Sequence, residues 1–88
     1  MNFEINIKDK SFKFISSLQI KDRERLKEAM LVLKEDPVPI KSLDITKLKG
    51  EKNKYRIRKG EFRIVYEIIW EQKLILIHRI DYRGNVYK

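Results

Sequence analysis

Residues 55–66 read Tyr-Arg-Ile-Arg-Lys-Gly-Glu-Phe-Arg-Ile-Val-Tyr, and their alternation predicts a β-hairpin with one apolar face and one basic face. Gly60 interrupts the run near its middle, where a tight turn would fall. The two registers that keep the faces consistent set Arg63 opposite either Arg56 or Arg58. The first needs a turn that begins before Gly60, and the second needs one that begins at Gly60. Since like charges directly opposite each other destabilise a sheet, either pair predicts a surface that meets an anion.

Two helices are predicted to follow a first strand. Asp9 or Ser11 is expected to cap the first helix, and residues 20–21 form the break between the two. Asp22 is expected to cap the second, which runs to about Glu35 before a proline-containing stop. The apolar stripe of the second helix, typical of core packing, consists of Leu26, Ala29, Met30 and Leu33.

The remaining alternation completes a β-α-α-β-β-β order. This order predicts an α+β fold, with an antiparallel sheet and the two-helix pair packed on one face. Residues 40–50 are expected to be a connection, and residues 1–88 a single domain. The last strand has apolar residues on both faces and should be either central or covered on both faces. The expected strands span residues 2–8, 55–59, 62–70 and 74–80.

The positive charge is concentrated around the hairpin. The chain has 21 basic and 13 acidic residues, a net charge of +8, and residues 47–63 alone contribute +6, from eight basic and two acidic side chains. A local basic patch points to a polyanion, most often nucleic acid, and the alternative is charge that serves general solubility.

Several site classes find little support in the composition. There is no cysteine and only one histidine, and no tight carboxylate cluster occurs, so no metal or other cofactor is expected. No leader or apolar run of membrane-spanning length appears, which predicts a cytoplasmic protein with no membrane partner. A nuclease on this chain would have to work without metal ligands of its own.

The arginines of the hairpin are well suited to phosphate. Guanidinium is planar and always charged, and it can hold two phosphate oxygens. Arg56, Arg58 and Arg63 could bind a phosphodiester passively, or they could stabilise a pentacoordinate phosphate during cleavage. The expected backbone-positioning contacts to RNA or the ribosome are Lys47, Lys49, Lys52, Lys54, Lys59 and Arg79.

The C-terminal segment offers further candidates. Arg83 and Tyr87 are within reach of the hairpin arginines if the last strand pairs with the middle one. A tyrosine there can stack on a base, exchange a proton or simply hold the chain end. By strict alternation, His78 shares a face with Leu76 and Ile80 while Arg79 points the other way, which favours a structural histidine over a general base.

These motifs together resemble the RelE branch of the RelE/ParE toxin superfamily. The resemblance implies a toxin with a cognate RelB-like antitoxin, which cleaves mRNA in the ribosomal A site without a metal. The ribose 2′-oxygen would attack the adjacent phosphate and leave a 2′,3′-cyclic phosphate and a 5′-hydroxyl. The residues that carry the resemblance are Leu48-Lys49-Gly50, Tyr55-Arg56-Ile57-Arg58, Phe62-Arg63-Ile64-Val65-Tyr66, Ile80-Asp81-Tyr82-Arg83 and Tyr87.

The resemblance also implies roles by position. Members of this branch often have lysine at the first two catalytic positions, and arginine is a poor proton shuttle because its pKa exceeds ~12. Tyr87 is then the first candidate for the proton relay, with Lys54 or Lys59 as weaker ones, and Arg79 is an alternative to Arg83. Two rival functions are a ParE-like DNA gyrase inhibitor and a non-catalytic RNA- or ribosome-binding protein. The implied catalytic residues are Arg56, Arg58, Arg63, Arg83 and Tyr87.

Overall fold

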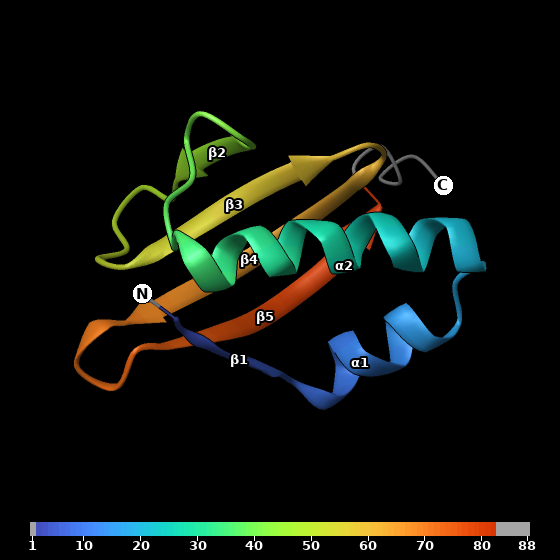
Figure 1. Cartoon of the computed structure of the whole chain (residues 1–88), viewed down its shortest axis with the longest axis horizontal. Coiled ribbons are helices and arrows are strands. Elements are labelled where there is room, and N and C mark those ends of the chain that lie inside the picture. Colours follow the sequence, from blue (N-terminus) through green and yellow to red (C-terminus); the bar gives the residue numbers. More distant parts are fainter. Residues whose placement is uncertain (1, 83–88) are drawn as a thin grey trace.

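A five-stranded sheet with two helices on one of its faces forms the molecule (Figure 1). The computed structural model describes residues 2–82. Across the sheet the strand order is β1-β5-β4-β3-β2. The predicted α+β class, with its helix pair on one face, is confirmed. The elements are β1 (Glu4–Ile7), α1 (Asp9–Ser16), α2 (Ile20–Glu35), β2 (Asp44–Lys47), β3 (Lys54–Lys59), β4 (Phe62–Ile69), the 3₁₀ turn η1 (Trp70–Gln72) and β5 (Leu74–Tyr82).

The sheet is mixed, whereas the sequence predicted an antiparallel one. β1 runs parallel to β5, with Ile5 beside Ile75, so β5 is an interior strand, between β1 and β4. The expected connection also contains the edge strand β2, in which Ile45 pairs with Ile57 of β3. Only four residues long, β2 has too little alternation to be recognised from sequence.

The hairpin takes the second of the two expected registers. Arg58 lies opposite Arg63, and Lys59 lies opposite Phe62, so the turn begins at Gly60. Gly60 has a φ of 60°, the left-handed value that glycine adopts without strain at the first turn position of a type II′ hairpin.

Both helices begin earlier than predicted. α2 starts at Ile20 with Gln19 in the cap position, so Asp22 is not the cap. Asp22 lies in the first turn, where its negative charge interacts favourably with the positive end of the helix dipole. α1 starts at Asp9, and no side chain donates or accepts a capping hydrogen bond there. The break lies instead between Ser16 and Ile20, and it contains the buried Leu18. The predicted end of α2 at Glu35 is confirmed.

The core lies between the helices and the sheet. Tyr66 is fully buried in it and donates a hydrogen bond from Oη to the Pro37 carbonyl, at 2.7 Å. Burial, with smaller contributions from Tyr55 and Asp36, raises the pKa of the Tyr66 phenol. The predicted apolar stripe of α2 is buried, as expected. The central core residues are Phe3, Leu26, Ala29, Leu33, Ile57, Phe62, Ile64, Tyr66, Ile68, Ile75, Ile77 and Ile80.

A β-bulge in β5 shifts the alternation of that strand. Val65 pairs with Arg79, but the next residue of β4 pairs with Ile77, so His78 is the extra residue. Ile77 and Ile80 are both buried against the helices, while His78 and Arg79 are not. The expectation that His78 shares a face with Ile80, opposite Arg79, is therefore wrong, because it assumed unbroken alternation.

Candidate functional site

The face of the sheet turned away from the helices collects the charged side chains of the strands. We call it the outer face. Its members follow from the strand registers and from the burial of their neighbours on the other face. Among them are Asp44, Thr46, Lys54, Arg56, Arg58, Arg63, Val65, Glu67, Leu76, His78, Arg79 and Asp81.

The strand pairings arrange these side chains in adjacent rows. The end row contains Asp44, Arg58, Arg63 and Asp81 in consecutive strands. One step further along the strands, the middle row contains Thr46, Arg56, Val65 and Arg79. Four arginines thus occupy two neighbouring rows, around the small apolar side chain of Val65.

Carboxylates hold the arginines of the end row. Arg58 Nε donates to Asp44 Oδ2 at 3.1 Å, and Arg63 Nε donates to Asp81 Oδ1 at 3.3 Å. The other oxygen of Asp81 accepts from Arg79 Nη2 at 3.1 Å. Within residues 2–82, the Nη groups of Arg58 and Arg63 make no hydrogen bond. These two guanidiniums are therefore oriented through Nε and keep donors for an anion.

Arg56 is the least compensated cation of the outer face. Among residues 2–82 it forms no ion pair, and its Nε is buried without a hydrogen-bond partner. A buried donor left without an acceptor costs about 1–3 kcal/mol, so its retention calls for an explanation beyond stability. A guanidinium without a carboxylate partner is free to neutralise an incoming anion.

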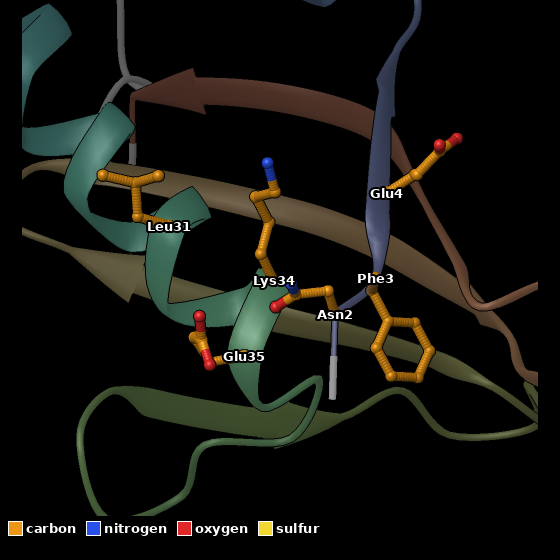
Figure 2. A pocket seen from close by; sticks show the side chains of 6 residues that line it. All are labelled: Asn2, Phe3, Glu4, Leu31, Lys34 and Glu35. Atoms are coloured by element: carbon orange, nitrogen blue, oxygen red, sulfur yellow. The ribbon is translucent and has the colours of Figure 1, made fainter.

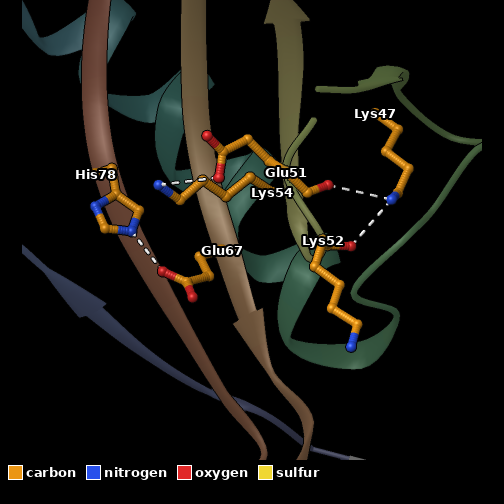
Figure 3. A network of polar contacts seen from close by, with 6 residues as sticks. All are labelled: Lys47, Glu51, Lys52, Lys54, Glu67 and His78. Carbon is orange, nitrogen blue, oxygen red and sulfur yellow. Dashed lines mark hydrogen bonds and ion pairs between the residues drawn. The ribbon is translucent and has the colours of Figure 1, made fainter. Parts of the chain in front are cut away.

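A third row continues the outer face beyond the middle row. Lys54 lies opposite Glu67 and forms an ion pair with Glu51 at 3.6 Å. Glu67 Oε1 lies 2.8 Å from His78 Nε2, which joins β4 to β5 (Figure 3). This end of the face therefore contains a histidine–carboxylate pair beside the arginine rows.

No family model matches the chain. A relative from Methanocaldococcus jannaschii, named "Putative toxin RelE1", is 34% identical over 88 residues, which cover 100% of this chain and 98% of the relative. The chain belongs to the RelE toxin family. The resemblance carried by the hairpin and the late Ile80–Arg83 motif is confirmed.

Solved RelE structures share the fold. RelE in the archaeal RelE–RelB complex from Pyrococcus horikoshii has a TM-score of 0.86 and 31% identity, with 98% of this chain and 100% of that chain covered. The RelB–RelE antitoxin–toxin complex from Methanococcus jannaschii gives a TM-score of 0.74 and 26% identity, with coverage of 93% and 94%. The isolated Escherichia coli RelE toxin gives 0.77 and 25%, with coverage of 97% and 90%.

The predicted lysines of this RelE family member are spread over different surfaces. Lys54 alone lies on the outer face beside the arginines. Lys59 lies on the helix side, 4.0 Å from Glu28 of α2. Lys47 Nζ donates to the Glu51 and Lys52 carbonyls at 3.2 and 3.0 Å and closes the loop between β2 and β3 (Figure 3). Lys49 and Lys52 are exposed on that loop.

The remaining predicted site residues divide into two groups. Arg56, Arg58, Arg63 and Arg79 are brought together on the outer face, whereas Arg83 and Tyr87 lie outside the described residues. Sequence reasoning missed the roles of three carboxylates, two that hold arginines and one that holds the histidine. Glu67 was recognisable, because it alternates with Arg63 on β4, but Asp44 was not, because β2 had no clear pattern. The missed carboxylates are Asp44, Glu67 and Asp81.

The surface hollows of the described chain lie elsewhere. One is lined by β1 and the C-terminal half of α2, with Phe3, Lys34 and Glu35 among its residues (Figure 2). A second, apolar groove lies between α1 and α2, with Phe12 and Met30 in its lining. Neither includes one of the outer-face arginines or the carboxylates that hold them, so the arginine rows lie outside these two hollows.

Residues 2–82 contain no group of three or more histidine, aspartate or glutamate side chains placed to hold a metal ion. Over the same residues, no helix is long and apolar enough to cross a membrane.

Proposed function

We propose that this RelE family member is the toxin of a toxin–antitoxin pair and a ribosome-dependent mRNA endoribonuclease that acts in the A site. The observation that carries the proposal is the convergence of Arg56, Arg58, Arg63 and Arg79 on an open face of a RelE-family fold. An open face accepts a long substrate, and closely spaced guanidiniums suit a phosphodiester.

The proposed reaction is attack of a ribose 2′-oxygen on the adjacent phosphate, without a metal or other cofactor. It yields a 2′,3′-cyclic phosphate and a free 5′-hydroxyl. Arg58 and Arg63, oriented by their carboxylates, and the uncompensated Arg56 would meet the charge that builds up on the phosphoryl oxygens. Fixed donors aimed at developing charge are a strong source of rate enhancement. Arg83 and Tyr87 lie outside the described residues, and their part in this catalytic site is still a prediction from the sequence.

The proposed partners are a RelB-like antitoxin, the ribosome and mRNA, in the cytoplasm. The similar structures from Pyrococcus horikoshii and Methanococcus jannaschii are complexes of RelE with RelB. The net charge of +8 favours an acidic antitoxin segment that covers the arginines, as well as binding to ribosomal RNA. Exposed lysines on the loop between β2 and β3 are suited to backbone contacts with RNA.

A programmed ribosome tests the proposal. The purified protein is incubated with a ribosome complex that has an empty A site, and the ends of the message are mapped. We expect one cut in the A-site codon, with a 2′,3′-cyclic phosphate upstream and a 5′-hydroxyl downstream. Intact message with gyrase-dependent DNA breaks would establish the ParE-like function instead. Tight, salt-sensitive ribosome binding without any cut would establish a non-catalytic binder.

A further inference from the structure

The β5 bulge places the one histidine of the chain on the outer face. His78 is the extra residue of the bulge and directly precedes Arg79, which lies in the middle row with Arg56. Without the bulge, His78 and Arg79 would lie on opposite faces. An imidazole therefore stands next to the arginine rows, at a position where strict alternation does not put one.

His78 is held in a defined orientation by Glu67. The Nε2–Oε1 distance of 2.8 Å joins neighbouring strands, and both side chains are about one-quarter to one-third exposed, at 22% and 32%. When a carboxylate accepts from Nε2–H, the lone pair of a neutral imidazole lies on Nδ1. Nδ1 makes no hydrogen bond with residues 2–82 and points away from Glu67 (Figure 3). The basic nitrogen is thus available to a substrate.

The other polar side chains near the arginines are poorly suited to move a proton. Arginine stays protonated at any pH that the protein meets. Lys54 is engaged with Glu51. Tyr66 lies in the core, and burial raises the pKa of its phenol. On the described part of the outer face, His78 is the group whose ordinary chemistry includes proton exchange near neutral pH.

We infer that His78 is the general base of the proposed cleavage and that Glu67 is its positioning residue. The inference rests on the proposed function. His78 Nδ1 takes the proton of the 2′-hydroxyl while the bond from the 2′-oxygen to phosphorus forms and the bond to the 5′-oxygen breaks. The leaving 5′-oxygen takes a proton from water, and the imidazolium returns its proton to the resulting hydroxide. The arginines hold the phosphate throughout.

Among residues 2–82, charged groups face His78 from each neighbouring strand. From β4 it meets Glu67, from β5 Arg79, and from β3, across Glu67, Lys54 with its partner Glu51. On β1, the neutral Asn6 lies opposite Leu76, and the same register continued past Ile7 and Ile77 puts Lys8 next to His78. The Lys8 backbone N–H donates to the Ile77 carbonyl at 3.3 Å, so Lys8 is a further cation beside the imidazole. A pH dependence that disappears when His78 is replaced but persists when either Lys8 or Lys54 is changed to Met can therefore be assigned to the imidazole.

The test compares single-turnover cleavage on the programmed ribosome over pH 5–8 for wild type, His78→Gln, Glu67→Gln and Asn6→Ala. We expect the wild-type rate to rise with pH and level off, as for a base that must be neutral. His78→Gln should lose roughly 10²–10⁴-fold in rate, typical of a lost general base, together with the pH dependence. Glu67→Gln should lose about 10-fold and keep the pH dependence, and Asn6→Ala should match wild type.

Ribosome binding and thermal unfolding of each variant separate chemistry from folding. Added imidazole should restore a measurable part of the rate of His78→Ala, which a purely structural histidine would not allow. A wild-type protein that cuts, with a His78→Gln variant of the same rate and pH profile, overturns the inference and leaves the proposed function intact. So does loss of the pH dependence in Tyr87→Phe but not in His78→Gln. A wild-type protein that never cuts overturns both.

Discussion

Arg58 and Arg63 lie directly opposite each other on β3 and β4, and each donates through Nε to a different carboxylate. Asp44 flanks the pair from β2, and Asp81 flanks it from β5. Two facing arginines would destabilise the hairpin by themselves, and the flanking carboxylates offset that repulsion. The end row is therefore stable in the free protein, and its outward Nη donors still suit phosphate.

Replacing Arg63 by Ala should abolish most cleavage. It removes the guanidinium that lies opposite Arg58 in the end row, and loss of one such donor typically lowers the rate by roughly 10²–10³-fold. Single-turnover cleavage of ribosome-bound message measures the effect. Arg23→Ala, the same change on an exposed position of α2, is the matched control and should retain the wild-type rate. Equal activity of the two variants would remove Arg63 from the mechanism.

Replacing Asp81 by Asn should strengthen RNA binding and weaken catalysis. The change frees Arg63 and Arg79 from a carboxylate that both of them share. The dependence of binding on salt should become steeper by about 0.7 for each new phosphate contact to single-stranded RNA. Cleavage of bound RNA should fall by about 10-fold, because Arg63 loses its fixed orientation. Binding titrations at several salt concentrations, together with single-turnover rates, check both effects.

Asp44→Asn is the comparison, since Asp44 holds only Arg58. Its effects on binding and on rate should be smaller than those of Asp81→Asn. Identical behaviour of the two variants would contradict a special role for the shared carboxylate.

Replacing Gly60 by Ala should cost stability and activity together. At a φ of 60° an L-residue is strained by about 1 kcal/mol, and the new Cβ would meet Arg25 Nη1 at 3.2 Å. Gly50→Ala is matched, because its φ is 77° and nothing lies within 4 Å of the place that its new methyl group would take. Both should lose similar stability in urea unfolding, but only the Gly60 variant should lose cleavage, since that turn sets Arg58 opposite Arg63. Full activity of Gly60→Ala would show that the register tolerates the change.

Replacing Tyr66 by Phe should lower stability by about 1–2 kcal/mol at neutral pH and leave cleavage unchanged. It removes the buried hydrogen bond to Pro37 and leaves that carbonyl without its partner. Tyr55→Phe is the control, because its ring stacks on Tyr66 while its hydroxyl makes no hydrogen bond with residues 2–82. A large loss of activity in Tyr66→Phe would contradict a purely structural role.

The same tyrosine should make stability fall in alkali. Burial raises the pKa of Tyr66 in the folded protein above its ordinary value of 10.0, so the unfolded chain releases this proton first. The stabilisation is complete below pH 10 and is lost as the pH rises further, by up to about 1.4 kcal/mol per pH unit. Urea unfolding at pH 9–11 should show this slope in wild type and a shallower one in Tyr66→Phe. Parallel curves would refute the assignment.

The hairpin shows how much of the structure the local alternation of residues can predict. Alternation placed Arg56, Arg58 and Arg63 on one face, and the position of Gly60 reduced the register to two choices, of which the structure has one. The core stripe of α2 was equally clear. The starts of the two helices could not be predicted in this way. Their cap residues, Lys8 and Gln19, have extended backbones but are not of the residue types that usually cap a helix.

Residues 55–66 by themselves specify a basic hairpin, since side-chain direction in a strand and the freedom of glycine at a turn are local properties. Tertiary structure decided what surrounds it. The parallel pairing of β1 with β5 and the ion pair from Asp44 depend on contacts between distant parts of the chain. The bulge is the clearest example, because pairing against β4, and not the order of residues in β5, places His78 on the same face as the arginines.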